Sequence, residues 1–500
     1  MRNLTKEEIK ILESQRCYAD DWKNITVADD FDAKNIRNTS FRGYVHIGRG
    51  VTINDTKLIK GSGDSKPCVI SVLNEGGDGN IVLTPHLTSQ LAWMMIHYPV
   101  VFNMVYAEAE KNTTSASCVI GDFAIIDGAT KIDDCFINSS KEVPTFIGSD
   151  VIMKKTVTAC GAEITDASKV YESFVGEAVH VGKGFSSEAS VFFANAYMDN
   201  GEACAAVCGP FACSHHKSTL LIGGEFSFYN AGSNTNQSNH AYKMGPIHWG
   251  VLQRGAKTAS GCHILWPATI GAFSMVMGKL TQHPDLSKLP FSYVFGDADK
   301  AYVYPGTNIK TVGTWRDINK WPTRDKRLET GRKDMITFDF PNPYIMQFVA
   351  KGKKLLEQIR NEQGDREEYL YEGCHIKKSA LEKGVKYYDM ILRLAPSYNA
   401  NMPEYVDMLG FVARKDDVEK IVKKVENGEL ANTDSLLAAI SLLEMEKTPI
   451  DTDGEAYKDW LSMIERDARK EFDMGDVTEE QLADFIKNMK WTTSVHLLHQ

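Results

Sequence analysis

Residues 46–61 read HIGRGVTINDTKLIKG, and residues 119–135 read VIGDFAIIDGATKIDDC. In both stretches an isoleucine recurs every six residues, at Ile47, Ile53, Ile59, Ile120, Ile126 and Ile132. The spacing returns, out of phase, at Val175 and Val181 and at Ile264 and Ile270. An aliphatic residue every six positions, followed by small residues, is typical of short strands that each place one side chain inward. The pattern predicts a mainly β fold, a left-handed parallel β-helix of hexapeptide repeats with about 18 residues per coil. The alternative is a two-sheet β-sandwich.

Two other regions follow a helical pattern. The apolar segment LAWMMIHYPVVFNMV at 91–105 contains Pro99, which is expected to kink or split a helix. After Pro343 the six-residue period stops and helical spacing begins, with Thr478 and Gln481 as a capping box. We therefore expect an N-terminal helix and the first coils in 1–84, a helical insertion in 85–115, the main β-helix with a polar site in 116–300, a basic strap in 301–344 and an all-helical C-terminal domain in 345–500.

Composition argues against several classes of protein. The chain has 56 Lys and Arg against 66 Asp and Glu, a net charge of −10, so it lacks the basic field of a nucleic-acid-binding protein. No apolar run approaches the roughly 20 residues that span a bilayer, and we expect no membrane partner. The first residues, MRNLTKEEIKILESQ, read as an amphipathic helix capped by Thr5 and Glu8 rather than as an export signal. Ten cysteines without such a signal predict reduced thiols in a cytoplasmic protein.

Residues 202–257 are richer in polar side chains than a structural β-helix requires, and four of the 13 histidines lie between His215 and His248. Histidine suits a general base because its pKa lies near neutrality. His240 is the first candidate, His215 the second, and Glu202 is a further catalytic candidate. The candidate ligand-binding residues are His216, Lys217, Asn230, Asn234, Asn236, Asn239, Lys243, His248, Arg254, Lys257, Arg316 and Arg324. Any one asparagine could instead be architectural, because asparagine tolerates left-handed corners.

Metal binding is a second possibility, and a divalent metal is the one cofactor that the sequence raises. His180, His215 and His248 are separated by roughly two coils each, and three neutral imidazoles could hold a catalytic zinc ion. The run Cys204, Cys208, Cys213 with its following histidines could also bind zinc. Buried thiols that fill a narrow interior are the alternative for this run.

Anion binding is a third possibility. Between Arg316 and Asp334 there are seven Lys and Arg against four Asp and Glu. Four basic residues, interleaved with Trp315 and Trp321, could bind a phosphate and stack on a base: Arg316, Lys320, Arg324 and Arg327. A solvated strap of ion pairs is the alternative.

Three segments resemble a known family: FACSHHKSTLLIGGEFSFYNAGSNTNQSNHAYKMGPIHWGVLQRGAKT at 211–258, ILWPATIGAFSMVMGKL at 264–280 and VGTWRDINKWPTRDKR at 312–327. The chain is similar to a family of uncharacterised bacterial proteins, a domain of unknown function common in gut anaerobes. That resemblance implies the trimeric acyltransferase-like superfamily of left-handed β-helices, and hence a homotrimer. In acyltransferases of this superfamily a histidine acts as base in a cleft between subunits. The resemblance implies no reaction for the family itself.

The leading hypothesis is an enzyme of carbohydrate or nucleotide-sugar metabolism, a group transferase with a histidine base on the β-helix face. Its substrate would be a small molecule, a phosphorylated or nucleotide-linked sugar. One alternative is a metal-dependent hydratase or hydrolase similar to the gamma-carbonic anhydrases. The other is a non-catalytic scaffold or sensor. No GxGxxG, P-loop, GxSxG or HExxH pattern is present, which argues against the enzyme classes that those motifs mark.

Overall fold

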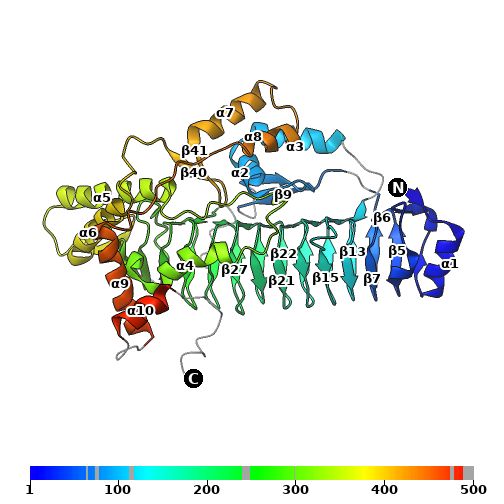
Figure 1. Ribbon diagram of the computed structural model, residues 1–500, viewed down its shortest axis with the longest axis horizontal. Coiled ribbons are helices and arrows are strands. Elements are labelled where there is room, and N and C mark those ends of the chain that lie inside the picture. The colour runs from blue at the N-terminus through cyan, green and yellow to red at the C-terminus, as the bar shows by residue number, and fades with distance from the viewer. Residues whose placement is uncertain are drawn as a thin grey trace.

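The chain folds as a mixed α/β protein in which long parallel sheets form a column and helices lie along one side and at both ends (Figure 1). The computed structural model describes residues 1–63, 66–73, 78–111, 117–238, 248–297, 299–472 and 478–487. Within these residues, no helix combines the length and the apolar character that crossing a bilayer requires.

Three sheets receive the short strands in rotation, and strands pair in parallel with the next strand of their own sheet except at the two ends, where the first pairing of sheet 1 and the last pairing of sheet 2 are antiparallel. Sheet 1 contains β1 (Arg2–Asn3), β3 (Ile25–Val27), β6 (Val45–Ile47), β11 (Cys118–Ile120), β14 (Phe136–Ile137), β17 (Val157–Thr158), β20 (Phe174–Val175), β23 (Val191–Phe192), β26 (Val207–Cys208), β29 (Glu225–Phe226), β31 (Val251–Leu252) and β34 (Thr269–Ile270). Its pairings are parallel except that of β1, which is antiparallel to β3.

Sheets 2 and 3 complete each turn of the chain. Sheet 2 contains β4 (Ile36–Arg37), β7 (Thr52–Asn54), β12 (Ile125–Asp127), β15 (Phe146–Ile147), β18 (Glu163–Ile164), β21 (His180–Gly182), β24 (Tyr197–Asp199) and β27 (Cys213–Ser214), and continues through Asn230 to β32 (Lys257–Thr258), β35 (Met275–Leu280), β36 (Tyr293–Asp297) and β37 (Lys300–Tyr304). Sheet 3 contains β2 (Tyr18–Ala19), β5 (Ser40–Gly43), β8 (Ile59–Gly61), β13 (Lys131–Asp133), β16 (Ile152–Lys154), β19 (Lys169–Tyr171), β22 (Ser186–Glu188), β25 (Glu202–Cys204), β28 (Leu220–Ile222), β30 (Asn236–Ser238) and β33 (His263–Leu265).

The six-residue period of the sequence corresponds to one strand on each sheet in turn. Ile47 pairs with Ile120 on sheet 1, Ile53 with Ile126 on sheet 2, and Ile59 with Ile132 on sheet 3. All six side chains are at most 1% exposed. Stacking like on like in this way removes the aliphatic side chains from water, which is the main favourable contribution to folding.

The first coils carry a short capping helix, and a separate lobe interrupts them. Helix α1 (Lys6–Ser14) begins at a capping box of Thr5 and Glu8, as the sequence predicts. After β8 the chain leaves the column for an antiparallel pair, β9 (Val69–Val72) and β10 (Gly79–Val82), and two helices, α2 (Ser89–His97) and α3 (Pro99–Lys111). Pro99 separates the two helices, as expected. The excursion starts earlier than the expected residue 85, because β9 and β10 pair with each other and not with the column.

The all-helical character expected for residues 345–500 is wrong. The helices α5 (Pro343–Gln363), α6 (Lys378–Leu394), α7 (Lys415–Glu426), α8 (Thr433–Ile440), α9 (Glu455–Glu471) and α10 (Glu479–Lys487) are interrupted by two hairpins, β38 (Glu368–Tyr371) with β39 (Cys374–Lys377) and β40 (Tyr405–Asp407) with β41 (Val412–Arg414). In the first hairpin Glu372 and Gly373 both have positive φ, as a tight hairpin turn requires, and Tyr369 and Ile376 are buried. The alternation of buried and exposed residues in these four-residue strands is a weaker sequence signal than the helical pattern on either side, which is why the sequence predicts helix throughout.

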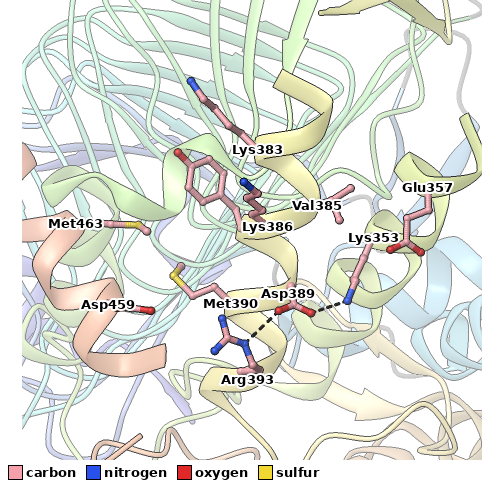
Figure 2. Close-up of a pocket in the computed structure, with 11 residues that line it drawn as sticks. Lys353, Glu357, Lys383, Val385, Lys386, Asp389, Met390, Arg393, Asp459 and Met463 are labelled. Carbon is pink, nitrogen blue, oxygen red and sulfur yellow. Dashed lines mark hydrogen bonds and ion pairs between the residues drawn. The ribbon is translucent and has the colours of Figure 1, made fainter. Parts of the chain in front are cut away.

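The C-terminal segments lie on two parts of the column. Helices α5, α6 and α9 gather at its end, where they surround a hollow of about 520 Å³ (Figure 2). Helices α7 and α8 lie beside α2 and α3 over sheet 1 (Figure 1). Outward-facing apolar residues of sheet 1, including Phe174 and Val191, are buried in that contact. Sheet 1 is therefore covered by chain from both the insertion and the C-terminal region.

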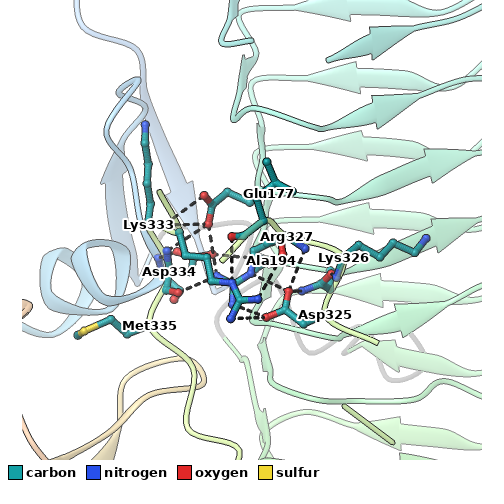
Figure 3. Close-up of polar contacts among 12 residues, drawn as sticks. Glu177, Ala194, Asp325, Lys326, Arg327, Lys333, Asp334 and Met335 are labelled. Atoms are coloured by element: carbon teal, nitrogen blue, oxygen red, sulfur yellow. Dashed lines mark hydrogen bonds and ion pairs between the residues drawn. The ribbon is translucent and has the colours of Figure 1, made fainter. Parts of the chain in front are cut away.

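Residues 324–342 run along the column as an ion-paired strap (Figure 3). The Arg327 guanidinium donates to Asp325 at 2.9 and 3.0 Å and to the Asp334 carbonyl oxygen at 2.7 Å, and it lies 3.4 Å from Glu177 of the column. Asn195 of the column donates to Asp325 at 2.9 Å. Arg327, one of the four candidate anion-binding residues, is therefore ion-paired, and its pair with Asp325 is buried rather than solvated, since the two side chains are 4% and 3% exposed.

Candidate functional site

A cavity of about 690 Å³ lies between sheet 2 and helix α4 (Val312–Thr323), which crosses the front of the column near β27 (Figure 1). Trp321 anchors the helix, because its ring packs 4.5 Å from Phe228 and 5.8 Å from Phe273 between centroids. The cavity is lined by Ala178, Lys183, Asn195, Ala196, Tyr197, Asp199, Phe211, Cys213, His215, Phe228, Tyr229, Asn230, Lys257, Asp317, Lys320, Trp321, Thr323, Arg324, Asp325 and Lys326. We call this cavity the α4 cleft.

One wall of the α4 cleft belongs to a row of polar side chains on sheet 2, which the pairing of neighbouring strands places in line. In sheet 2, His180 pairs with Tyr197, Tyr197 with Cys213, Cys213 with Asn230, and Asn230 with Lys257. Paired residues of neighbouring strands lie about 4.8 Å apart and point to the same face. The register therefore places these five side chains in one line although they are far apart in sequence.

The opposite wall contributes a buried carboxylate shared among cations. Asp317 of α4 is 1% exposed; it accepts from Lys320 at 2.6 Å and from the Arg316 Nε at 3.1 Å, and it forms an ion pair with Lys257 of the column. Burial and the neighbouring cations lower the pKa of Lys257 well below its usual value. Burial, followed by Arg316 and Arg324, lowers the pKa of Lys320 to about 7, while its ion pair with Asp317 opposes that shift. One carboxylate faces three basic groups here, and a bound anion would favour the protonated forms of the two lysines.

The lowered pKa of Lys320 has a measurable effect on stability. Between about pH 7 and about pH 10 the unfolded chain holds a proton on this lysine that the folded protein has lost. The unfolded state then binds more protons, so the free energy of unfolding rises with pH in this window. The contribution is present above pH 10 and is lost as the pH falls through about 7. Denaturation across this range is expected to show a smaller rise for Lys320→Met than for the wild type, and equal slopes would contradict the assignment.

Next to the cationic cluster lies a thiol–imidazole pair. Cys213 Sγ is 2.9 Å from His215 Nδ1, and both side chains line the cleft. Burial, followed by the adjacent His216, lowers the pKa of His215 below its usual value, so the imidazole is neutral at neutral pH. Burial raises the pKa of Cys213 to about 11, while Lys320 and Arg324 act in the opposite direction. A neutral imidazole that faces a cavity is able to accept a proton.

A second histidine, His180, lies between two carboxylates near the α4 cleft. His180 lies 3.1 Å from Glu163 and 3.2 Å from the buried Asp199, and Lys183 lies 2.8 Å from Asp199. Gly182 is required here, because a Cβ at that position would come within 2.6 Å of His180 Nε2 and 2.8 Å of Asp199 Oδ1. The glycine thus leaves room for the His180–Asp199 contact.

The structure brings together some of the predicted site residues and separates others. His215, Asn230, Lys257 and Arg324 line the α4 cleft, and Arg316 binds Asp317 at its edge. The His216 ring lies tilted against that of His215, with centroids 4.1 Å apart, but His216 and Lys217 are exposed to solvent. Asn239, His240 and Lys243, including the first candidate base, lie outside the described residues.

Three other candidates lie on a different face. Glu202 and Asn236 belong to strands of sheet 3, not to the sheet that lines the cleft. Asn234 has a φ of 55° at an exposed corner, which is the architectural alternative for an asparagine.

Arg254 serves the interior of the protein rather than a ligand. It is 3% exposed; it donates to Asp407 at 2.8 Å, to the Thr337 carbonyl oxygen at 2.6 Å and to the Gly410 carbonyl oxygen at 2.7 Å. The sequence shows an arginine in a polar stretch, whereas these acceptors come from residues more than eighty positions away.

No group of three or more His, Cys, Asp or Glu suited to a metal ion occurs within the ranges that the structure describes. His180 and His215 lie near the cleft, but His248 is not among its lining residues. The run Cys204, Cys208 and Cys213 does not converge, because the three cysteines fall on sheets 3, 1 and 2 in turn. All ten cysteines are free thiols.

Sequence reasoning missed Lys183, Tyr197 and Asp199. Glu163, His180 and Tyr197 recur every 17 residues, close to one coil, and that spacing could have placed them in one line. Nothing local to residues 312–323 indicates that this helix would cover them. The second hollow, between α5, α6 and α9, contains none of the predicted site residues, and its Asp389 is already paired with Lys353 at 2.6 Å and Arg393 at 3.1 Å (Figure 2).

Comparison with known proteins supports a family assignment and no specific activity. No curated protein sequence matches this chain. Among solved structures, a protein from Desulfovibrio desulfuricans G20 named as a "putative acetyltransferase" is 13% identical, covering 55% of this chain and 70% of its own, with a TM-score of 0.14. The sequence profile of one family, described as a domain of unknown function (DUF4954), matches residues 1–62 and 107–360, which is more than half of the chain. The unmatched residues between those ranges include β9, β10 and α2, so the profile skips most of the lobe that leaves the column. The chain belongs to the DUF4954 family.

Proposed function

We propose that the α4 cleft binds an anionic small molecule and that the protein is a group transferase, with His215 as general base. The observation that carries the proposal is the position of the neutral His215 beside the cationic cluster around Asp317, within one cavity. His215, the second candidate base of the sequence analysis, lines this cavity, whereas His240, the first candidate, lies outside the described residues.

Charge favours an anionic ligand. Five basic side chains line the cleft, from Lys183, Lys257, Lys320, Arg324 and Lys326, against three carboxylates, from Asp199, Asp317 and Asp325. Burial lowers the pKa of Lys257 and of Lys320, and a bound anion would favour their protonated, cationic forms. Ionised donors form stronger hydrogen bonds to phosphate or carboxylate than neutral donors do. The substrate class that we propose is therefore a phosphorylated or nucleotide-linked sugar.

Aromatic walls favour a ligand that also carries a flat apolar part. The rings of Tyr197, Phe228 and Trp321 line the same cavity as the cations. Such rings stack on a base or on the apolar face of a sugar, while the polar groups of the cleft set its orientation. A nucleotide-linked sugar offers both an anion and a ring.

We further propose that the three sheets form a left-handed parallel β-helix and that the protein acts as a cytoplasmic homotrimer. The rotation of successive strands through three parallel sheets supports the β-helix, and ten free thiols fit a reducing compartment.

Thermal denaturation against nucleotide sugars, sugar phosphates, acyl-CoAs and divalent metals tests the binding part of this proposal. A ligand at 100 times its dissociation constant is expected to stabilise the fold by about 2.7 kcal/mol. Lys320→Met should weaken the affinity of that ligand about ten- to hundredfold, because a charged hydrogen bond contributes about 1.5–3 kcal/mol. Lys420→Met is the matched control, since Lys420 also pairs with an aspartate three residues before it on a helix, but outside the cleft.

The transferase part is tested by His215→Gln. With a ligand identified, turnover should fall about 10²–10⁴-fold while binding changes little, because a general base acts in the transition state. If no anion stabilises the protein, or if Lys320→Met and Lys420→Met behave alike, the cleft is not the binding site. Stabilisation by zinc alone would instead favour a metal-dependent hydratase, and stabilisation by nothing would favour a scaffold.

A further inference from the structure

Cys213 is placed differently from the cysteines of the coil interior. Cys118, Cys135, Cys208 and Cys262 are at most 1% exposed and belong to the hydrophobic core. Cys213 is partly exposed and lines the α4 cleft. A thiol that only fills space needs no access to a cavity, whereas a nucleophile does.

The geometry around Cys213 contains the parts of an activated nucleophile. His215 Nδ1 is 2.9 Å from the sulfur, within reach of its proton. His215 is held by its neighbours: its ring lies tilted against that of His216 and edge-on to that of Tyr197, with centroids 4.1 and 6.2 Å away. Its backbone carbonyl oxygen accepts from the Asn200 side chain at 3.3 Å. His215 directly follows β27, two positions after Cys213, and its ring turns back to the sulfur of that residue.

Groups that would stabilise an oxyanion surround the same sulfur. Burial raises the pKa of Cys213 to about 11, and Lys320 of α4 and Arg324 just after it are close enough to act against that rise. Asn230 is the register neighbour of Cys213 on the next strand, about 4.8 Å away, and it also lines the cleft. Donors already in place where negative charge develops are a major source of catalytic rate.

We propose that Cys213 is a catalytic nucleophile that accepts an acyl group from the thioester of an anionic carrier bound in the α4 cleft, with His215 as its base. The inference rests on the proposed function in that the carrier is the anion held by the Asp317 cluster. It adds a covalent intermediate and narrows the transferred group to an acyl group.

The step balances as a thioester exchange. The thiol proton of Cys213 passes to His215 Nδ1 as the sulfur attacks the acyl carbonyl carbon. The bond between that carbon and the carrier sulfur then breaks, and the carrier leaves as a thiol after taking the proton from His215. An acceptor hydroxyl or amine attacks the acyl-cysteine in the second half, His215 removes the acceptor's proton, and the Cys213 thiol is restored.

The test uses the full chain with acetyl-CoA as the probe, followed by intact-mass and peptide mass spectrometry. The expected result is one acetyl group on Cys213, lost in Cys213→Ser and retained in Cys160→Ser. Cys160 is the matched control because it is also partly exposed. Burial raises the pKa of its thiol, and Lys333 acts in the opposite direction, as Lys320 does at Cys213. Absence of the adduct on Cys213, or an equal adduct on Cys160, overturns the proposal.

A second readout needs no substrate. Alkylation by iodoacetamide should be faster at Cys213 than at Cys160, and His215→Ala should reduce it to the rate of Cys160. If His215→Ala leaves alkylation of Cys213 unchanged, the pair has no activating role and the proposal falls.

Binding of acetyl-CoA by Cys213→Ser, measured by thermal shift, separates this proposal from the proposed function. Binding without an adduct on the wild type removes only the acyl-cysteine step, whereas absence of anion binding removes the proposed function itself.

Discussion

Replacing Arg254 with methionine is expected to lower the free energy of unfolding by about 3–5 kcal/mol, the usual loss when one partner of a buried ion pair is removed. Arg254 follows β31 of sheet 1, and its guanidinium lies 4.5 Å above the Phe228 ring. It binds the Asp407 side chain together with carbonyl oxygens of Thr337 and Gly410. The variant would leave all three acceptors buried without this donor. One side chain therefore connects the column, the strap and the β40–β41 hairpin.

The cost is increased by a second acid near Asp407. Burial, followed by Asp407, raises the pKa of Glu225 to about 8, so the two acids already disfavour a second negative charge in this region. Without Arg254 no described cation balances Asp407 at ion-pair distance. Arg254→Lys should recover only part of the loss, because a lysine cannot reach three acceptors in a fixed planar geometry.

Chemical denaturation of Arg254→Met and of Arg393→Met measures this effect. Arg393 pairs with Asp389 on an exposed helix face, and its loss should cost less than about 1 kcal/mol. Similar midpoints for the two variants would mean that Arg254 does not hold the C-terminal hairpin to the column. The double variant Arg254→Met with Asp407→Leu should regain stability over Arg254→Met, because it removes the unpaired carboxylate.

Replacing Asp334 with alanine is the second large change, with an expected loss of about 2–4 kcal/mol from two buried donors left without an acceptor. The carboxylate accepts from the Ser89 backbone N–H at 2.7 Å and from the Ala194 backbone N–H at 3.1 Å (Figure 3). Ser89 is the first residue of α2, so Asp334 satisfies a donor at the start of that helix. It thereby joins the strap, the inserted lobe and the column.

The pKa of Asp334 gives this prediction a pH signature. Burial, followed by Glu177, raises the pKa to about 6, above the ordinary value near 4. Between those values the folded protein binds a proton that the unfolded chain lacks, so this group contributes most stability below about pH 4 and loses it as the pH rises through about 6. Asp334→Asn should abolish that dependence.

Thermal denaturation at several pH values between 4 and 7 checks both variants. Asp21→Ala is the control, since Asp21 accepts a backbone N–H at an exposed short helix, and its loss should cost about 1 kcal/mol or less. An Asp334→Ala protein as stable as Asp21→Ala would show that the strap does not depend on this carboxylate.

Local sequence patterns were enough to predict which side chains point into the column and where several helices begin. The recurrence of Ile47, Ile53 and Ile59 indicated which side chains point inward, and all three are buried. The capping residues Thr5 and Thr478 stand before helices where expected, because a cap is satisfied by backbone groups within one turn. Pro99 separates α2 from α3 because proline lacks the N–H that a continuous helix needs.

The same patterns carried little information about the outer faces. His215 and Lys257 were singled out by residue type, but their meeting with Lys320 and Asp317 depends on α4 docking across sheet 2. Arg254 was chosen by the same criterion, yet its acceptors at Thr337, Asp407 and Gly410 make it structural.

The period of the sequence by itself determined the inward side chains of the column, because a six-residue repeat reports the geometry of a single coil. Only the tertiary structure decided which outward side chains form a site. The outward-facing residues of one sheet cannot be told from those of another by their local sequence. The segments that cover these outer faces come from distant parts of the chain. Helix α4 arrives on sheet 2 through long-range packing of Trp321 against Phe228 and Phe273. Such contacts leave no periodic trace in either partner's sequence, so the α4 cleft emerges only when the chain is folded.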